Sequence, residues 1–253
     1  MKIAYIFSGH SRTWEQCHTN FFNNIYNILP GDIFIHTWDR VNAGTTSWWN
    51  VWNRKGGMNS TLRLKPASEK IADIEGIKAR YNPKHIIVEK DPSWDEIPHQ
   101  WARPKYESHP QWDHVQTTPR FGAKYILYAF KTIFDIAKEY DNYDRFFCSR
   151  LDINFLSALD LIELENPNLV LSQTKLSSED FRQDIFFHGT KNHIELRSEY
   201  YNHIEEYWYD KDYINLQFEH ALTNYLKDKN IPISDSNLRF NIPRITGKTS
   251  VFQ

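Results

Sequence analysis

The residues best suited to chemistry follow a short apolar run near the middle of the chain. That run, at residues 146–148, is typical of a strand buried on both faces. Arg150, Asp152 and Asn154 then occupy alternate positions, which in a continuing strand would point to one side. Carboxylate and amide oxygens suit Mg²⁺, and a guanidinium pairs with phosphate. The pattern predicts a cation or phosphate site, the alternative being an Asp–Arg pair that closes a strand.

A second polar cluster connects a predicted strand over 2–8 to a predicted helix over 12–28. Its candidates for binding a ligand are Ser8, Gly9, His10 and Arg12. Glycine lets the backbone approach a ligand closely, while amides at the start of a helix, together with an arginine, favour an anion. The loop lacks the Gly-Lys-Ser/Thr end of a Walker loop and two of the three glycines of a Rossmann fingerprint. An ordinary strand–helix turn is the alternative.

Three aspartates mark further candidate positions. Asp39 follows a predicted strand over 32–38, where a carboxylate can accept a hydrogen bond from a ribose hydroxyl. Asp184, and as second choice Asp180, precedes an apolar strand predicted over 185–187 and could act as a general base. An exposed aspartate at the start of a strand is the other interpretation.

These candidate residues follow different predicted strands, and a sheet of parallel strands would bring them together at one edge. The sequence predicts strands over 2–8, 32–38, 84–89, 144–149, 169–171, 185–187 and 231–234, and helices over 12–28, 68–81, 120–140, 190–208 and 213–228. This order predicts βαβ units and a mainly parallel central sheet flanked by helices, with the carboxyl ends of the strands along one edge. Ser68 is the expected N-cap of its helix, and His36 an expected hydrogen-bonded core residue.

Composition narrows the class of protein. Thirty basic and 32 acidic residues give a formal net charge of −2, which gives no support for a nucleic-acid partner. Two cysteines form no disulfide framework, and no apolar run is long enough to cross a membrane, so we expect a cytoplasmic protein. The nine tryptophans gather largely in two long polar segments, 40–66 and 91–118, where they could form platforms for sugar rings or tie the loops to the core.

Taken in order, the motifs resemble those of a known group of enzymes. A strand leads into Ser-Gly-x-x-Arg-Thr, a second strand ends in His-Thr-Trp-Asp, and Tyr-Asp-x-x-x-x-Ser-Arg-x-Asp-x-x-Phe follows a helix. This series resembles small glycosyltransferases of the GT-A type from bacterial lipopolysaccharide and capsule clusters, large DNA viruses and phages. The resemblance covers roughly residues 2–39 and 116–190.

The resemblance implies a single Rossmann-like GT-A domain over 1–253. Its nucleotide-binding half would span about 1–155, and its acceptor side 156–253 together with the loops 40–66 and 91–118. The donor would be a nucleotide sugar and the acceptor a glycan. The reaction would take place in the cytoplasm of a bacterium or of a virus-infected host cell.

Several residue roles also follow from the resemblance. An Asp-x-Asp-like element in these enzymes holds a divalent metal, Mn²⁺ or Mg²⁺, against the diphosphate. Here Asp152 takes that role or contacts ribose, with Asn154 as a helper, but Arg150 replaces the first acidic residue and could itself neutralise phosphate. His10 stands where relatives often carry Gln, and Asp184 matches an acidic residue near the acceptor.

Two other functions fit the same residues. One is a non-catalytic carbohydrate-binding protein that uses the aromatic loops. The other is a different nucleotide-dependent transferase, such as a nucleotidyl- or sulfotransferase. The residues do not decide whether a glycosyltransferase of this kind would invert or retain the configuration of the sugar.

Overall fold

The computed structural model describes most of the chain, with gaps. The described residues are 1–41, 70–90, 120–172, 185–210, 213–214, 218–243 and 249–252. The tryptophan-rich segments 40–66 and 91–118, expected on the acceptor side, therefore lie almost entirely outside the described residues. Asp180 and Asp184 also lie outside them.

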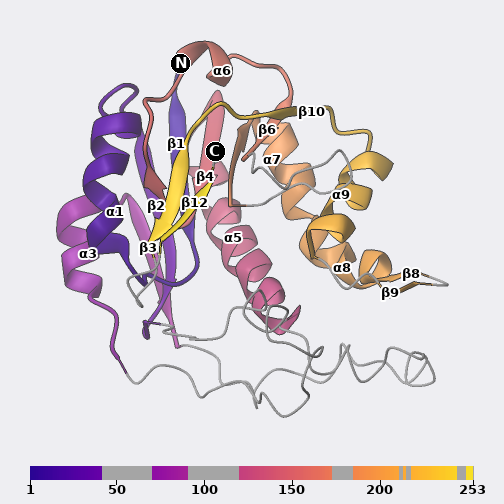
Figure 1. Ribbon diagram of the computed structural model, residues 1–253, viewed down its shortest axis with the longest axis horizontal. Coiled ribbons are helices and arrows are strands. Elements are labelled where there is room, and N and C mark those ends of the chain that lie inside the picture. Colours follow the sequence, from indigo (N-terminus) through magenta and orange to yellow (C-terminus); the bar gives the residue numbers. More distant parts are fainter. Residues whose placement is uncertain are drawn as a thin grey trace.

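A seven-stranded sheet in the order β10-β6-β7-β4-β1-β2-β3 forms the centre of the molecule (Figure 1). Its strands are β1 (Ile3–Ser8), β2 (Asp32–Trp38), β3 (His85–Glu89), β4 (Arg145–Ser149), β6 (Leu169–Leu171), β7 (Phe186–Gly189) and β10 (Ile233–Asp235). Neighbouring strands are parallel except around β7, which runs antiparallel to β4 and β6. The predicted mainly parallel α/β sheet is confirmed, and β1, β2, β3 and β4 all end at one edge.

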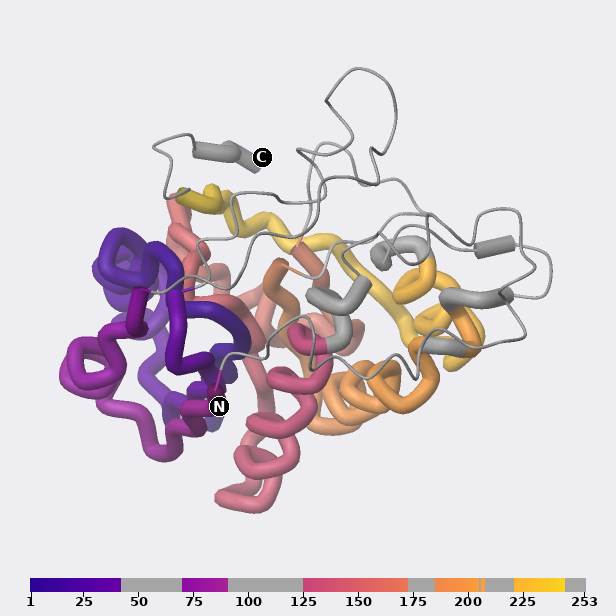
Figure 2. Tube along the Cα trace, turned by 90° about the horizontal axis from the view of Figure 1, so that it is seen from below, coloured from indigo at the N-terminus to yellow at the C-terminus, as the bar shows by residue number. Residues whose placement is uncertain are grey.

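Helices cover both faces of this sheet. They are α1 (Trp14–Phe21), α3 (Ile74–Tyr81), α5 (Arg120–Tyr140), α6 (Leu161–Leu164), α7 (Lys191–Ser198), α8 (Tyr200–Trp208) and α9 (Phe218–Asp228). One apolar core joins the sheet to α5, α7, α8 and α9, and the other joins it to α1, α3 and α6. Figure 2 shows α5 running between the N-terminal part of the chain and the orange helices α7 and α8.

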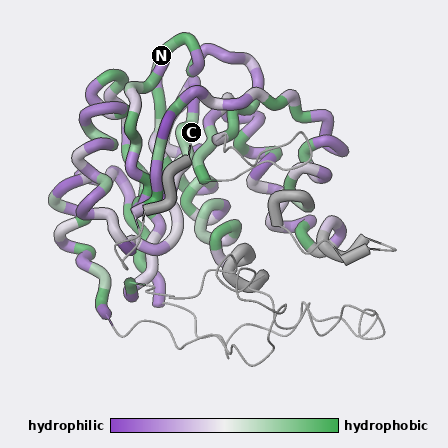
Figure 3. Tube along the Cα trace, viewed as in Figure 1, coloured by the Kyte–Doolittle hydropathy of each residue, from purple (hydrophilic) through white to green (hydrophobic). Residues whose placement is uncertain are grey.

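Burial explains why the strands could be recognised from sequence. Every residue of β1 and β4 is buried, as in a parallel sheet covered on both faces, and green hydrophobic segments run through the central strands in Figure 3. In α5, Phe130, Ile133 and Ala137 face the core, and each is at most 3% exposed. His36 is confirmed as a core histidine, since its Nε2 lies 3.1 Å from Glu89 Oε2 and it is 0% exposed.

Helix boundaries differ from the predictions at several points. The helix predicted over 12–28 ends as an α-helix at Phe21 and continues as a π-helical turn over Phe22–Tyr26. The helix predicted over 190–208 is divided into α7 and α8 at Glu199. The helix predicted over 213–228 begins only at Phe218, because residues 213–214 pair with 209–210 as the short strands β9 and β8.

The helix predicted to start near Ser68 also begins later than expected. It starts at Ile74, and its N-cap is Asp73, whose Oδ1 accepts a hydrogen bond from the amide of Gly76 at 2.9 Å. Aspartate is as effective at this position as serine, and it lies next to the first helical turn. The expected cap, Ser68, falls outside the described residues.

A small antiparallel sheet was not predicted. It consists of β5 (Asn154–Phe155), β11 (Phe240–Pro243) and β12 (Thr249–Phe252), in the order β12-β11-β5. Phe155 and Phe240 of this sheet are buried in the same core as α1. It therefore packs on the α1 side of the central sheet, next to the residues that follow β4.

Candidate functional site

The loop between β1 and α1 begins at the carboxyl edge of the sheet. Ser8 ends β1 opposite His36 of β2, and the amide of Gly9 donates to the carbonyl oxygen of His36 at 3.1 Å. Gly9 has a φ of +105°, and a Cβ there would meet nothing within 4 Å. Glycine is therefore favoured by the backbone angle, which other residues adopt only with strain, and not by lack of space.

Arg12 lies further along this loop in an unusual backbone conformation. Its φ of 30° is positive, which is uncommon for a residue other than glycine and is often found at functional sites. Its Nη1 lies 3.5 Å from Asp152 Oδ2. The hydroxyl of the next residue, Thr13, donates to the carbonyl oxygen of Pro243 at 3.2 Å, which fixes the loop to β11.

Asp152 receives a second guanidinium from its own turn. Arg150 Nε donates to Asp152 Oδ1 at 2.8 Å, and Arg150 Nη2 donates to Oδ2 at 2.5 Å. The side chain of Asp152 is only 1% exposed, whereas those of Arg150 and Arg12 are 23% and 30% exposed. The carboxylate is thus buried beneath two arginines that reach toward solvent, in the strong bidentate geometry of a charge-assisted pair.

This geometry corrects the prediction of a continuing strand. β4 ends at Ser149, and Leu151 and Asp152 form a turn, so a strand period does not order the side chains here. Asn154 belongs instead to β5, opposite Asn241, and its Oδ1 accepts from Asn20 Nδ2 at 2.6 Å. The Arg150–Asp152 pair is formed, as the alternative interpretation proposed, but by a turn and not by alternation.

His10 and Asp39 lie at the same edge. His10 packs near Trp38, with ring centroids 6.0 Å apart, and its Nδ1 lies 3.5 Å from the carbonyl oxygen of Arg40. Burial and the nearby Arg12 lower the pKa of His10 to about 3, so the imidazole is neutral. Asp39 directly follows β2, and its amide donates to the carbonyl oxygen of Glu89 at 2.8 Å.

Both cysteines of the chain are buried free thiols. Burial and the negative charge of Asp152 raise the pKa of the Cys17 thiol to about 12, and burial likewise raises that of Cys148. A thiolate, not a thiol, is the nucleophile in cysteine chemistry. Neither residue is therefore suited to nucleophilic catalysis.

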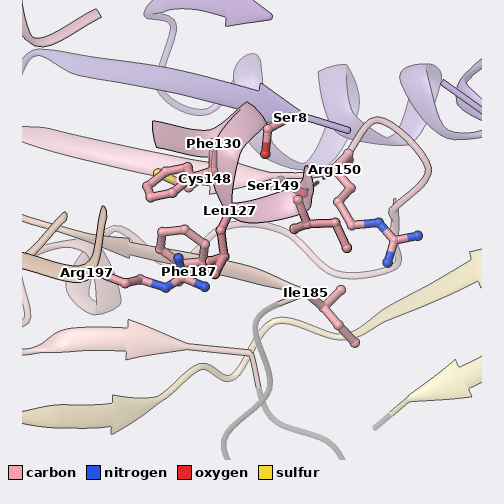
Figure 4. A pocket seen from close by; sticks show the side chains of 10 residues that line it. Ser8, Leu127, Phe130, Cys148, Ser149, Arg150, Ile185, Phe187 and Arg197 are labelled. Carbon is pink, nitrogen blue, oxygen red and sulfur yellow. Dashed lines mark hydrogen bonds between the residues drawn. The ribbon is translucent and has the colours of Figure 1, made fainter. Parts of the chain in front are cut away.

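A pocket lies on the α5 side of the same edge (Figure 4). It is partly open to solvent and is lined by Ser8, Ile126, Leu127, Phe130, Cys148, Ser149, Arg150, Ile185, Phe187 and Arg197. Arg197, from α7, is 2% exposed, and its Cζ lies 3.6 Å from the ring centroid of Phe187. The sequence does not predict Arg197 as a site residue, because a lone arginine inside a helical segment carries no motif.

The residues expected to hold a metal do not fit one well. Both oxygens of Asp152 accept from Arg150, and Asn154 Oδ1 accepts from Asn20. Within the described part of the chain, no three His, Cys, Asp or Glu side chains are grouped as they are around a metal ion. A hard divalent cation binds through several oxygens that face it together, and Asp152 and Asn154 do not provide this arrangement.

No family model and no curated protein matches the chain. Among the described residues, none of the helices is both long and apolar enough to cross a membrane.

Proposed function

We propose that the protein is a GT-A-like glycosyltransferase that moves a sugar from a nucleotide-sugar donor to a hydroxyl of a glycan acceptor. One observation carries the proposal: Arg12 and Arg150 converge on the buried Asp152 where β1 and β4 end. Ligands of open α/β sheets bind at this carboxyl edge. The order of the sequence motifs supports the same assignment.

The chemistry of sugar transfer matches what this edge offers. A nucleoside diphosphate leaves with negative charge, and preorganised positive groups lower the free energy of the transition state in which that charge develops. Arg12 and Arg150 supply such groups, because a guanidinium pairs with phosphate in a fixed, planar geometry. Gly9 lets the chain approach the donor closely, and Asp39 would accept from a ribose hydroxyl.

An inverting reaction also needs a base for the acceptor hydroxyl. We propose Asp184 for this role, with Asp180 as the second candidate. Asp184 directly precedes Ile185, which lines the pocket together with Arg150. A retaining reaction would need no such base.

We place the reaction in the cytoplasm. The only two cysteines are buried free thiols, which suits a reducing compartment.

Thermal-shift measurements with UDP-, GDP-, CMP- and dTDP-sugars test the proposal. A ligand that binds only the folded state raises the melting temperature, by an amount that grows with its concentration relative to Kd. We expect one nucleotide class to raise the melting temperature and Arg150→Ala to remove the shift. Arg80→Ala, in the exposed part of α3, is the matched control and should keep it. No shift with any nucleotide sugar would contradict the proposal.

Product analysis separates the proposal from its rivals. A glycosyltransferase releases a nucleoside diphosphate or, from a CMP-sugar, a nucleoside monophosphate, whereas a carbohydrate-binding protein releases nothing. A nucleotidyltransferase would release pyrophosphate from a nucleoside triphosphate, and a sulfotransferase would consume a phosphosulfate donor. Asp152→Asn should abolish transfer in a folded protein, at a cost of about 2–4 kcal/mol of transition-state stabilisation.

A further inference from the structure

Arginine side chains contact both carboxylate oxygens of Asp152. Arg150 contacts both of its oxygens at 2.8 and 2.5 Å, and Arg12 Nη1 lies 3.5 Å from Oδ2. With only 1% of the side chain exposed, a cation could reach these oxygens only if a guanidinium were displaced. Separating a buried carboxylate from its charged partner is costly, since the desolvated charge would lose its hydrogen bonds.

The charges of the cluster favour an anion. Arg12 and Arg150 bring two guanidinium groups to the one carboxylate of Asp152. A guanidinium has five N–H donors in a planar fork that matches carboxylate and phosphate oxygens, and Arg150 directs two of its nitrogens at Asp152. The two side chains are 23% and 30% exposed, so they face solvent while their carboxylate does not.

The backbone around Arg12 supports the same conclusion independently. Its φ of 30° is a strained conformation for arginine, and such strain persists where the surrounding structure holds the residue in place. Thr13 is fixed to Pro243 by a hydrogen bond of 3.2 Å, and Gly9 to His36 by one of 3.1 Å. The loop is thus anchored on both sides of Arg12, whose guanidinium lies beside Asp152.

We infer that Arg12 and Arg150, held in place by Asp152, neutralise the donor diphosphate directly, so that the protein binds nucleoside diphosphates without a divalent metal. The inference rests on the proposed function and gives Asp152 a positioning role. A metal-dependent site would instead need Asp152 to turn an oxygen away from Arg150.

Calorimetry with UDP, GDP and inorganic pyrophosphate tests the inference, with each titration performed in EDTA and again with added Mn²⁺. We expect pyrophosphate and one nucleotide to bind in EDTA, with Mn²⁺ changing Kd by less than about threefold. In EDTA, Arg12→Ala and Arg150→Ala should each weaken binding about tenfold to a hundredfold, the usual effect of losing a charged hydrogen bond. Arg80→Ala should not change Kd.

Two further variants separate positioning from charge. Arg150→Lys keeps the charge but loses the bidentate contact. Its affinity for pyrophosphate should lie between those of Arg150→Ala and the unmodified protein. Asp152→Asn makes the cluster more positive, yet it should weaken pyrophosphate binding in EDTA because Arg150 loses its fixed orientation. Melting temperatures near that of the unmodified protein would show that the variants fold.

The possible failures of the inference and of the proposed function are distinguishable. Binding that appears only with Mn²⁺ would overturn the inference and leave the glycosyltransferase proposal standing. Unchanged or tighter binding by Asp152→Asn in EDTA would remove its positioning role. If neither the nucleotides nor pyrophosphate bind under either condition, the inference fails. The glycosyltransferase proposal fails only if the wider panel of nucleotide sugars also gives no thermal shift.

Discussion

Two residues of the β1–α1 loop have positive φ angles, Gly9 at 105° and Arg12 at 30°. For an arginine this conformation costs free energy that contacts elsewhere must offset. Arg12 has such a contact, because its Nη1 lies 3.5 Å from Asp152 Oδ2. At the scale of single residues, the site therefore depends on a strained loop that holds one arginine against a buried carboxylate.

Gly9→Ala tests this dependence. The added Cβ would meet no atom within 4 Å, so its cost comes only from the φ of +105°. We expect a loss of about 1–2 kcal/mol in the free energy of unfolding and weaker nucleotide binding, since the loop would relax toward a negative φ. Urea denaturation and calorimetry measure the two effects.

Gly31→Ala provides the comparison. There a Cβ would collide with the carbonyl oxygen of Ile3, so this variant should lose more stability than Gly9→Ala. Because Gly31 directly precedes β2, at the opposite edge of the sheet, the folded protein should bind nucleotide normally. Equal effects of both variants on affinity would show that the loop conformation at Gly9 has no specific role.

His10 makes stability depend on pH. Burial and Arg12 lower its folded pKa from 6.5 to about 3, even though Asp152 acts in the opposite direction. As pH falls through 6.5, the unfolded chain takes up a proton that the folded chain does not, so the unfolded state is favoured. Between pH 7 and pH 5 we expect this residue to remove about 1–2 kcal/mol from the free energy of unfolding.

The variant His10→Gln removes this titration while keeping a polar side chain. Urea denaturation at both pH values should show a shallower pH dependence than in the unmodified protein. His36 and His188 also have lowered pKa values, so part of the dependence should remain. His203→Gln, on a half-exposed part of α8, is the control. An identical pH dependence in His10→Gln would contradict the assigned shift.

At the scale of elements, a buried network connects α6, β7 and the segment before β11. Glu163 of α6 lies 3.1 Å from His188 Nε2 and accepts from the Ser236 hydroxyl and the Asn237 amide, each at 2.6 Å. Burial raises the pKa of Glu163, but these hydrogen bonds outweigh it and hold the pKa below its usual value. Because β11 ends at the Pro243 that anchors Thr13, the network supports the small sheet on which the site loop rests.

Replacing Glu163 by Gln should destabilise the fold by about 2–3 kcal/mol, because buried donors would lose a charged acceptor. The contribution of the carboxylate is present at neutral pH and lost as pH falls through its folded pKa, so the difference between the two proteins should shrink in acid. Chemical denaturation at neutral pH and at a pH well below the ordinary glutamate pKa of 4.5 measures this. Glu165→Gln, an exposed neighbour, should change little, and an equal loss there would contradict the role of the network.

The elements that sequence predicted well carry strong local patterns. The range of α5 matches the prediction, as do those of β2 and β6, because a helical apolar pattern defines α5 and short apolar runs define the two strands. The small sheet could not be predicted in this way. Its strands have only two to four residues, too few to show an alternating pattern. Asn154 also pairs with Asn241, which is far away in the sequence, and no local sequence pattern indicates such a contact.

Part of the site was predictable from sequence, but Arg197 and the geometry of the site were not. Gly9, Arg12, Arg150 and Asp152 were candidates from their residue types and from their places after predicted strands. The contact between Arg12 and Asp152 joins residues far apart in sequence and depends on a backbone angle that no pattern encodes. Asp152 lies in a turn, so Asp152 and Asn154 do not share one face of a continuing strand as their alternate positions predict.

At the scale of the whole molecule, a sheet buried on both faces leaves its carboxyl edge for binding. Two apolar cores occupy its faces, and the loops that follow β1, β2 and β4 place Gly9, Asp39 and Arg150 at that edge. The chain as a whole is slightly acidic, with a formal net charge of −2, so the positive arginine cluster is a local feature.

Detection of the nucleoside phosphate released from a panel of nucleotide sugars, by mass spectrometry with and without added Mn²⁺, tests the central claim most directly. Glycosyltransferases bring the donor to reaction, and water can replace a missing acceptor. We predict slow release from one class of donor, reduced about a hundredfold or more by Arg150→Ala and unchanged by Arg80→Ala. Intact donors throughout the panel, or equal release by Arg150→Ala, would contradict the account.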